Sequence, residues 1–137
     1  MNIEDFFATL LSSVTVTHKL HLDTNKYSTH KCLNDFYDEM PDLADDLIEH
    51  YTGIYGKADI NSGIDLISDQ LLLSSPVAYI QELRRIVVDG KSLFSEDDTE
   101  LLSDIDSILG LIDSTLYQLK ELKESKRIKR FSDFKNM

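Results

Sequence analysis

Residues 95–122 have the sequence SEDDTELLSDIDSILGLIDSTLYQLKEL, a pattern typical of a long amphipathic helix. Ser95 precedes three consecutive acids, which predicts a helix N-terminus with a serine cap and negative charge at the positive end of the helix dipole. Apolar side chains then recur every three or four residues, at Leu101, Leu102, Ile105, Ile108, Leu109, Ile112, Leu116, Leu119 and Leu122. This segment is therefore expected to be the last helix of the chain.

The same periodicity predicts three more long helices, over residues 3–21, from about residue 26 to 51, and over 76–90. Thr24 or Asn25 is a candidate cap for the second of them. Pro41 interrupts that second helix, which is expected either to kink there or to break and restart with proline in the first turn. A short helix capped by Asn61 or Ser62 is predicted before the third long helix, and Ser75–Pro76 predicts a sharp helix start.

The composition agrees with an all-α protein of one domain. Only five glycines and two prolines interrupt 137 residues, of which 42% are hydrophobic. We expect a four-helix bundle over residues 1–124 and a basic C-terminal tail over 125–137. No apolar run approaches the roughly 20 residues that cross a bilayer, the start MNIEDFF is acidic, and Cys32 has no cysteine to pair with. These features predict a cytoplasmic protein without a membrane segment.

The net charge of -11 is unevenly distributed along the chain. Residues 118–137 carry a net charge of +4, so residues 1–117 carry -15. Phosphate repels such an acidic surface, which argues against nucleic acid binding over most of the protein. The basic end is either a solvated helix terminus or the contact for an anionic partner, and DNA binding could depend only on this tail.

The second predicted helix carries an unusual concentration of acids: Asp42, Asp45, Asp46 and Glu49. Residues four apart share a helical face, so Asp45 and Glu49 could reach one metal ion, and their oxygen ligands suit iron or manganese. His30 precedes Asp45 by about 22 Å along one helix, too far for both to ligate one ion within a chain. Two copies that pack this helix antiparallel about a two-fold axis would bring His30 of one copy to Asp45 and Glu49 of the other. The alternative is a solvated acidic stripe with scattered histidines.

The spacing His-x11-His-x14-Asp-x3-Glu, formed by His18, His30, Asp45 and Glu49, resembles the ferroxidase signature of the Dps branch of the ferritin-like proteins. The resemblance implies a ferritin-like four-helix bundle with a short extra helix between the second and third long helices. It also implies an iron site shared by two subunits, with His18 and His30 from one chain and Asp45 and Glu49 from its two-fold mate. Manganese or zinc could replace iron, and the implied assembly is a homo-oligomer built from two-fold dimers, up to a dodecamer-like cage.

The chain also departs from the Dps pattern. An acid of the family falls on Asn34, the usual tryptophan after the first histidine is Lys19, and Pro41 lies within helix two. His21 has no family role and is interpreted as a surface residue or an auxiliary ligand. Two functions stay open: an iron-binding ferroxidase, and a ferritin-like scaffold that acts through protein interactions. Short acidic chains of this kind look like Dps-like proteins encoded by bacteriophages. In that case the scaffold could modulate a host factor, in the host cytoplasm.

Overall fold

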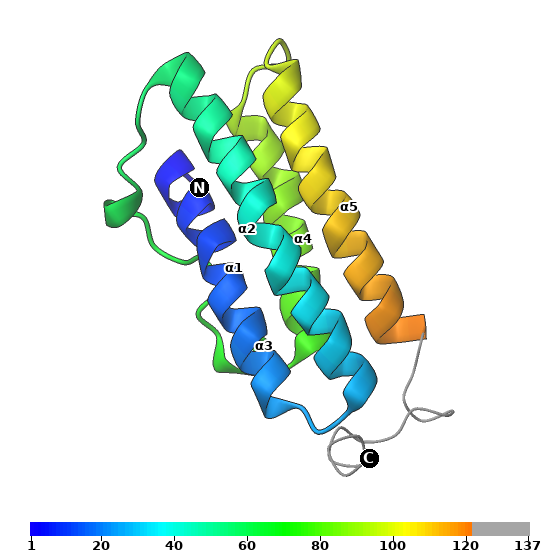
Figure 1. Cartoon of the computed structure of the whole chain (residues 1–137). Helices are drawn as coiled ribbons and strands as arrows, with labels where there is room; N and C mark the ends of the chain where they lie inside the picture. Colours follow the sequence, from blue (N-terminus) through cyan, green and yellow to red (C-terminus); the bar gives the residue numbers. More distant parts are fainter. Residues whose placement is uncertain (122–137) are drawn as a thin grey trace.

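The computed structural model describes residues 1–121, which contain five α-helices, two short 3-10 helices and no β-strand (Figure 1). The elements are α1 (Ile3–Asp23), α2 (Tyr27–Tyr55), η1 (Ile60–Ser62), α3 (Gln70–Leu73), α4 (Pro76–Gly90), η2 (Lys91–Leu93) and α5 (Thr99–Glu121). The predicted all-α class is confirmed. The predicted basic tail, residues 125–137, lies outside the described residues.

The four long helices form two antiparallel pairs, α1 with α2 and α4 with α5. Between the pairs, the chain runs from the end of α2 back along the whole bundle to the start of α4 (Figure 1). Because of this long crossover, α2 and α4 point in the same direction. Helix α1 also contacts α4, and α2 contacts α5, which closes the four-sided arrangement.

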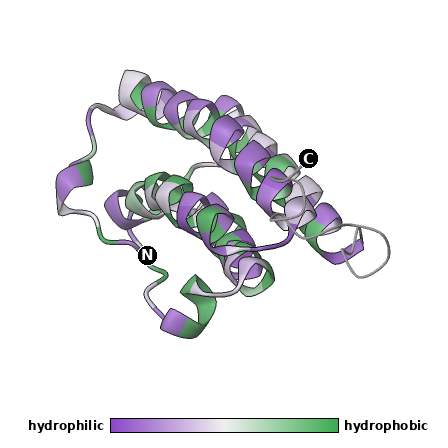
Figure 2. Cartoon of the chain, turned by 60° about the horizontal axis from the view of Figure 1, so that its bottom comes forward, coloured by the Kyte–Doolittle hydropathy of each residue, from purple (hydrophilic) through white to green (hydrophobic). Residues whose placement is uncertain are grey.

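The core lies between these four helices, and each contributes one apolar face to it. Figure 2 shows hydrophobic and hydrophilic residues interleaved along each long helix, as expected for amphipathic packing. The fully buried side chains include Phe6, Phe7 and Leu10 of α1, Leu33, Phe36, Met40 and Leu47 of α2, Tyr79, Ile80 and Leu83 of α4, and Leu101, Ile105, Ile108 and Ile112 of α5. None of the long helices in residues 1–121 is apolar enough over a sufficient length to cross a membrane.

The prediction of a short helix over residues 61–73 is wrong for most of that range. The segment contains only η1 and the four-residue α3, which Asp69 caps, and the residues between them are irregular. The chain here lies directly on α1: a Cβ on Gly63 would be 2.2 Å from the carbonyl oxygen of Glu4. The backbone N–H of Ile64 donates to Asp5, and that of Leu66 donates to Thr9. These contacts with α1 satisfy backbone groups that a helix would have used itself.

Helix α2 continues through Pro41 without a break and extends to Tyr55, four residues beyond the predicted end. Gly56 ends it in the left-handed region, with φ of 88°. At its start, Lys26 occupies the cap position without a side-chain hydrogen bond, so the prediction of Thr24 or Asn25 as the cap is wrong. Thr24 instead caps the end of α1.

The predicted serine cap is confirmed at the start of α4 but not at the start of α5. The predicted Ser75–Pro76 start of α4 is confirmed, because the Ser75 hydroxyl accepts from the Ala78 N–H. Ser95 accepts from the N–H of Asp97 and so stabilises a turn, whereas α5 begins later, at Thr99. The acids after Ser95 therefore mostly precede α5 instead of forming its first turn.

Candidate functional site

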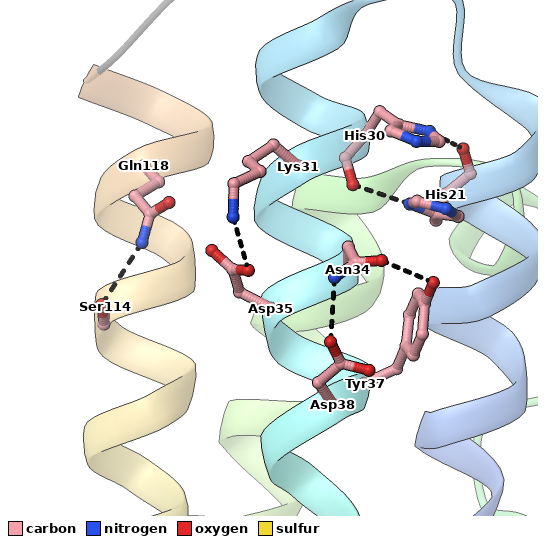
Figure 3. Close-up of polar contacts among 9 residues, drawn as sticks. All are labelled: His21, His30, Lys31, Asn34, Asp35, Tyr37, Asp38, Ser114 and Gln118. Carbon is pink, nitrogen blue, oxygen red and sulfur yellow. Dashed lines mark hydrogen bonds and ion pairs between the residues drawn. The ribbon is translucent and has the colours of Figure 1, made fainter.

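His21 and His30 come together where α1 ends and α2 begins. Their rings stack with centroids 3.5 Å apart and an interplanar angle of 24°. His21 Nδ1 lies 2.7 Å from the carbonyl oxygen of His30, and His30 Nδ1 lies 3.0 Å from the carbonyl oxygen of His21 (Figure 3). Because a carbonyl oxygen only accepts, each ring donates through Nδ1–H and, when neutral, has its lone pair on Nε2. Metal-bound histidines are commonly oriented in the same way, by a hydrogen bond from the other ring nitrogen.

His18 and Tyr37 extend this pair into a cluster of four rings. The ring centroid of His18 lies 4.5 Å from that of Tyr37 and 5.9 Å from that of His21. Tyr37 also meets His21 edge to face, at 5.1 Å. We call His18, His21, His30 and Tyr37 the histidine cluster.

Asn34 links the cluster to the acidic surface of α2. It accepts a hydrogen bond from the Tyr37 hydroxyl at 2.8 Å and donates one to Asp38 at 2.9 Å (Figure 3). Asn34 is the position at which the Dps pattern has an acid. Here its amide orients the tyrosine, and Asp38 provides a carboxylate one turn further along the helix.

Burial shifts the pKa of two members of the cluster, His21 and Tyr37. The side chain of His21 is only 6% exposed, and its burial, together with the nearby rings of His30 and His18, lowers its pKa below the ordinary value for histidine. Burial also raises the pKa of Tyr37. His21 is therefore a neutral imidazole at neutral pH, the form of histidine that binds metal ions.

The interpretation of His21 as a surface residue is wrong, and its role was missed from the sequence. Leu10, Thr17 and His21 are spaced by seven and four residues, so they share the buried face of α1. His30 and Tyr37 are likewise seven residues apart on α2. These two spacings are the sequence signal that could have identified the cluster.

Asp45 and Glu49 lie on the exposed face of α2, away from the histidine cluster. Neither has an ion pair or a hydrogen bond with another side chain in residues 1–121. Because α2 is continuous, about 22 Å of helix separates His30 from Asp45. The structure thus places His18 and His30 each beside His21, and it places Asp45 and Glu49 elsewhere. Within residues 1–121 of one chain, no three His, Cys, Asp or Glu side chains are arranged to hold a metal ion.

Comparison with known proteins finds similarity to a protein encoded by a phage. The chain is 28% identical over 116 residues to an uncharacterized 14.6 kDa protein from the mobD-ri intergenic region of Enterobacteria phage T4. The alignment covers 85% of this chain and 86% of that protein. No solved structure matches. A family model matches residues 21–119, which include His21, His30, Asp45 and Glu49 but not His18. The chain belongs to DUF5856, a family of unknown function.

Proposed function

We propose that this protein is a Dps-like member of the ferritin-like proteins that binds and oxidises iron at a site shared by two copies of the chain. One observation carries the proposal. His30 lies near the start of one uninterrupted helix, and Asp45 and Glu49 lie further along the same helix. A backbone carbonyl orients the His30 ring, and the two carboxylates are exposed and have no ion pair within residues 1–121.

The topology supports a ferritin-like arrangement. Four-helix bundles with a single long crossover are characteristic of ferritin-like folds. Here residues 56–75 form such a crossover along α1, and α3 takes the place of the short helix found between the second and third long helices in Dps. The crossover is consistent with the proposal even though most of its predicted helix is absent.

The shared site would form when two α2 helices pack antiparallel. His30 of one copy then lies near Asp45 and Glu49 of the other if the two-fold axis passes close to residues 38 and 39. His18 and His30 would supply neutral nitrogen ligands, and the two carboxylates would supply oxygen ligands. Two bound iron(II) ions would each lose one electron and become iron(III). The two electrons, with two protons, would reduce dioxygen to hydrogen peroxide or hydrogen peroxide to two waters, and a cage-like assembly could store the iron(III). Manganese or zinc could occupy the same ligands.

This packing also predicts when the dimer forms. Asp38, Glu39 and Asp42 are near the axis, so each copy would present acids to the same acids of the other. Like charges at such short range oppose association in the absence of cations. We therefore expect dimerisation to require a divalent metal.

The test is an anaerobic iron(II) titration of the full-length protein, with its mass in solution measured in EDTA and in manganese(II). We expect about two ions or more per dimer and dimerisation only with metal. Binding should be lost in His18→Ala/His30→Ala and in Asp45→Ala/Glu49→Ala. Asp42→Ala/Asp46→Ala, which removes the same charge from the same helix, is the matched control and should keep binding. A chain that binds no iron and stays monomeric in metal would refute the proposal.

A second candidate function is an acidic interaction scaffold, as expected for a modulator of a host factor. The observation that favours it is that α2 has more unpaired acids than the iron site would use. Glu39, Asp42 and Asp46 have no ion pair within residues 1–121. By contrast, Asp106 and Asp113 of α5 are paired with Lys91 and Arg84. Unpaired charges that the fold does not need are available to a basic partner.

A further inference from the structure

We propose that the groove between α2 and α5 is a docking site for a basic amphipathic helix of a partner protein. This inference deepens the second candidate function and does not depend on iron. The groove encloses about 360 Å³. Its least exposed lining residues, here called its floor, are the buried Cys32 and Thr115 and the half-buried Leu43 and Leu111.

The two walls of the groove differ in charge, and this difference favours a basic partner. On the α2 side, Asp35 and Glu39 are four residues apart and line the groove. On the α5 side the lining residues are small or neutral, and none of the groove residues is basic. Asp35 is paired with Lys31 at 3.0 Å, an exposed contact that an incoming cation can replace (Figure 3). A partner that fills the groove therefore meets two carboxylates along one edge, of which Glu39 has no ion pair within residues 1–121.

Gly110 is the second, independent observation. Glycine is unfavourable in the middle of a helix, and Gly110 lies near the middle of α5. At Gly63 and Gly90 a Cβ would collide with Glu4 and Phe6, so the fold itself requires glycine at those positions. At Gly110 a Cβ would meet nothing within 4 Å, and the position is exposed in the groove wall. The described fold gains nothing from this glycine, whereas a second helix could approach α5 closely there.

The surroundings favour a helix over an extended peptide. The groove runs between two antiparallel helices whose backbone groups bond within each helix, so an extended segment would find no backbone partners. A helix satisfies its own backbone and can place apolar side chains on the floor and basic ones against Asp35 and Glu39. Figure 3 shows Asp35 on the side of α2 that faces Ser114 and Gln118 of α5.

The probe for the test is a dye-labelled peptide of about 14 residues, with leucine at helical spacing and lysine between, together with a counterpart in which glutamate replaces lysine. Binding to the full-length protein is measured by fluorescence anisotropy without metal. We expect the basic peptide to bind and the acidic one not to bind. Asp35→Asn/Glu39→Gln should weaken binding about tenfold or more, and so should Gly110→Leu, which fills the groove.

Two matched controls show whether a loss of affinity comes from the groove itself. One tests the effect of removing charge elsewhere on α2, and the other tests the effect of replacing a helical glycine outside the groove. Asp45→Asn/Glu49→Gln removes the same charge from α2 outside the groove, and Gly53→Leu changes an exposed glycine with equally open surroundings. Both should keep wild-type affinity, and far-UV circular dichroism should show that all variants fold. If both charge variants lose affinity for the basic peptide equally and Gly110→Leu has no effect, the groove is not the docking site. The acidic scaffold proposed as the second candidate function would then still hold. No binding, or equal binding of both peptides, would overturn both.

Discussion

Replacing Gly63 by alanine tests how the crossover is held on the bundle. The new Cβ would lie 2.2 Å from the carbonyl oxygen of Glu4 and 3.0 Å from Cβ of Ala8. The first of these atoms is backbone in the first turn of α1, so no change of rotamer can relieve the overlap. The crossover must move away from α1.

The expected cost follows from the contacts next to Gly63. Moving the segment breaks or weakens two hydrogen bonds at 2.9 Å, from Ile64 N–H to Asp5 and from Leu66 N–H to Thr9. A hydrogen bond of this kind contributes about 0.5–1.5 kcal/mol net, so we expect a loss of about 1–3 kcal/mol in the free energy of unfolding. In urea denaturation followed by circular dichroism, this corresponds to a midpoint lower by about 0.5–1.5 M.

Gly53→Ala is the matched control for this experiment. Gly53 lies in the last turn of α2 with nothing within 4 Å of its Cβ position, so alanine should leave stability unchanged or raise it by up to about 1 kcal/mol. The two glycine-to-alanine changes should thus shift the midpoint in opposite directions or by clearly different amounts. A Gly63→Ala protein as stable as wild type would refute the contact between the crossover and α1.

Three further predictions concern single side chains. The Asp104 carboxylate, 2.7 Å from His50, raises the pKa of that histidine, so the contact stabilises the fold below about pH 6.5 and the stabilisation is lost as pH rises through the folded-state pKa. The ion pair therefore raises the urea midpoint of the wild type at about pH 5.5 relative to that at about pH 8.5. Asp104→Asn should remove this contribution, and an equal difference between the two midpoints in variant and wild type would contradict the ion pair. The lowered pKa of His21 acts in the opposite direction, because the folded state resists protonation and loses stability as pH falls below about 6.5. His21→Phe should therefore reduce the acid-side loss in the same assay, and an equal loss in variant and wild type would count against burial of a neutral ring. Cys32 is 3% exposed, so a thiol reagent should label it slowly in the native protein and rapidly in denaturant; fast native labelling would contradict its burial.

Apolar periodicity was sufficient to predict the four long helices, because each buries one continuous face. Tertiary contacts determine the conformation of two segments that the periodicity did not predict correctly. Residues 61–73 have apolar side chains at helical spacing, yet the chain is extended at Gly63 and lies against the α1 backbone, an approach that the absence of a Cβ permits. Pro41 lies inside α2 even though proline costs about 3 kcal/mol in a helix interior, and the packing of the helix on both sides of it offsets that cost.

The candidate site was predictable only in part. Spacing along the chain placed Asp45 and Glu49 on one face, and the resemblance to Dps implied that His18 and His30 act together. Neither showed that His21 is the ring stacked on His30, because that contact depends on how α1 and α2 meet at the turn between them. His21, which has no role in the Dps pattern, is buried and contacts the other three rings of the cluster.

A complementation experiment tests the shared iron site most directly. His18→Ala/His30→Ala retains the carboxylates, and Asp45→Ala/Glu49→Ala retains the histidines, so neither variant alone can form a complete site. In a two-fold dimer made of one chain of each kind, one of the two sites is intact. Because dimerisation is expected to require metal and only the mixed dimer has a complete site, equal co-expression should restore about one half of the wild-type number of iron(II) ions per chain in an anaerobic titration. A mixture that binds no iron, or a single variant that binds as well as wild type, would contradict a site shared between two copies.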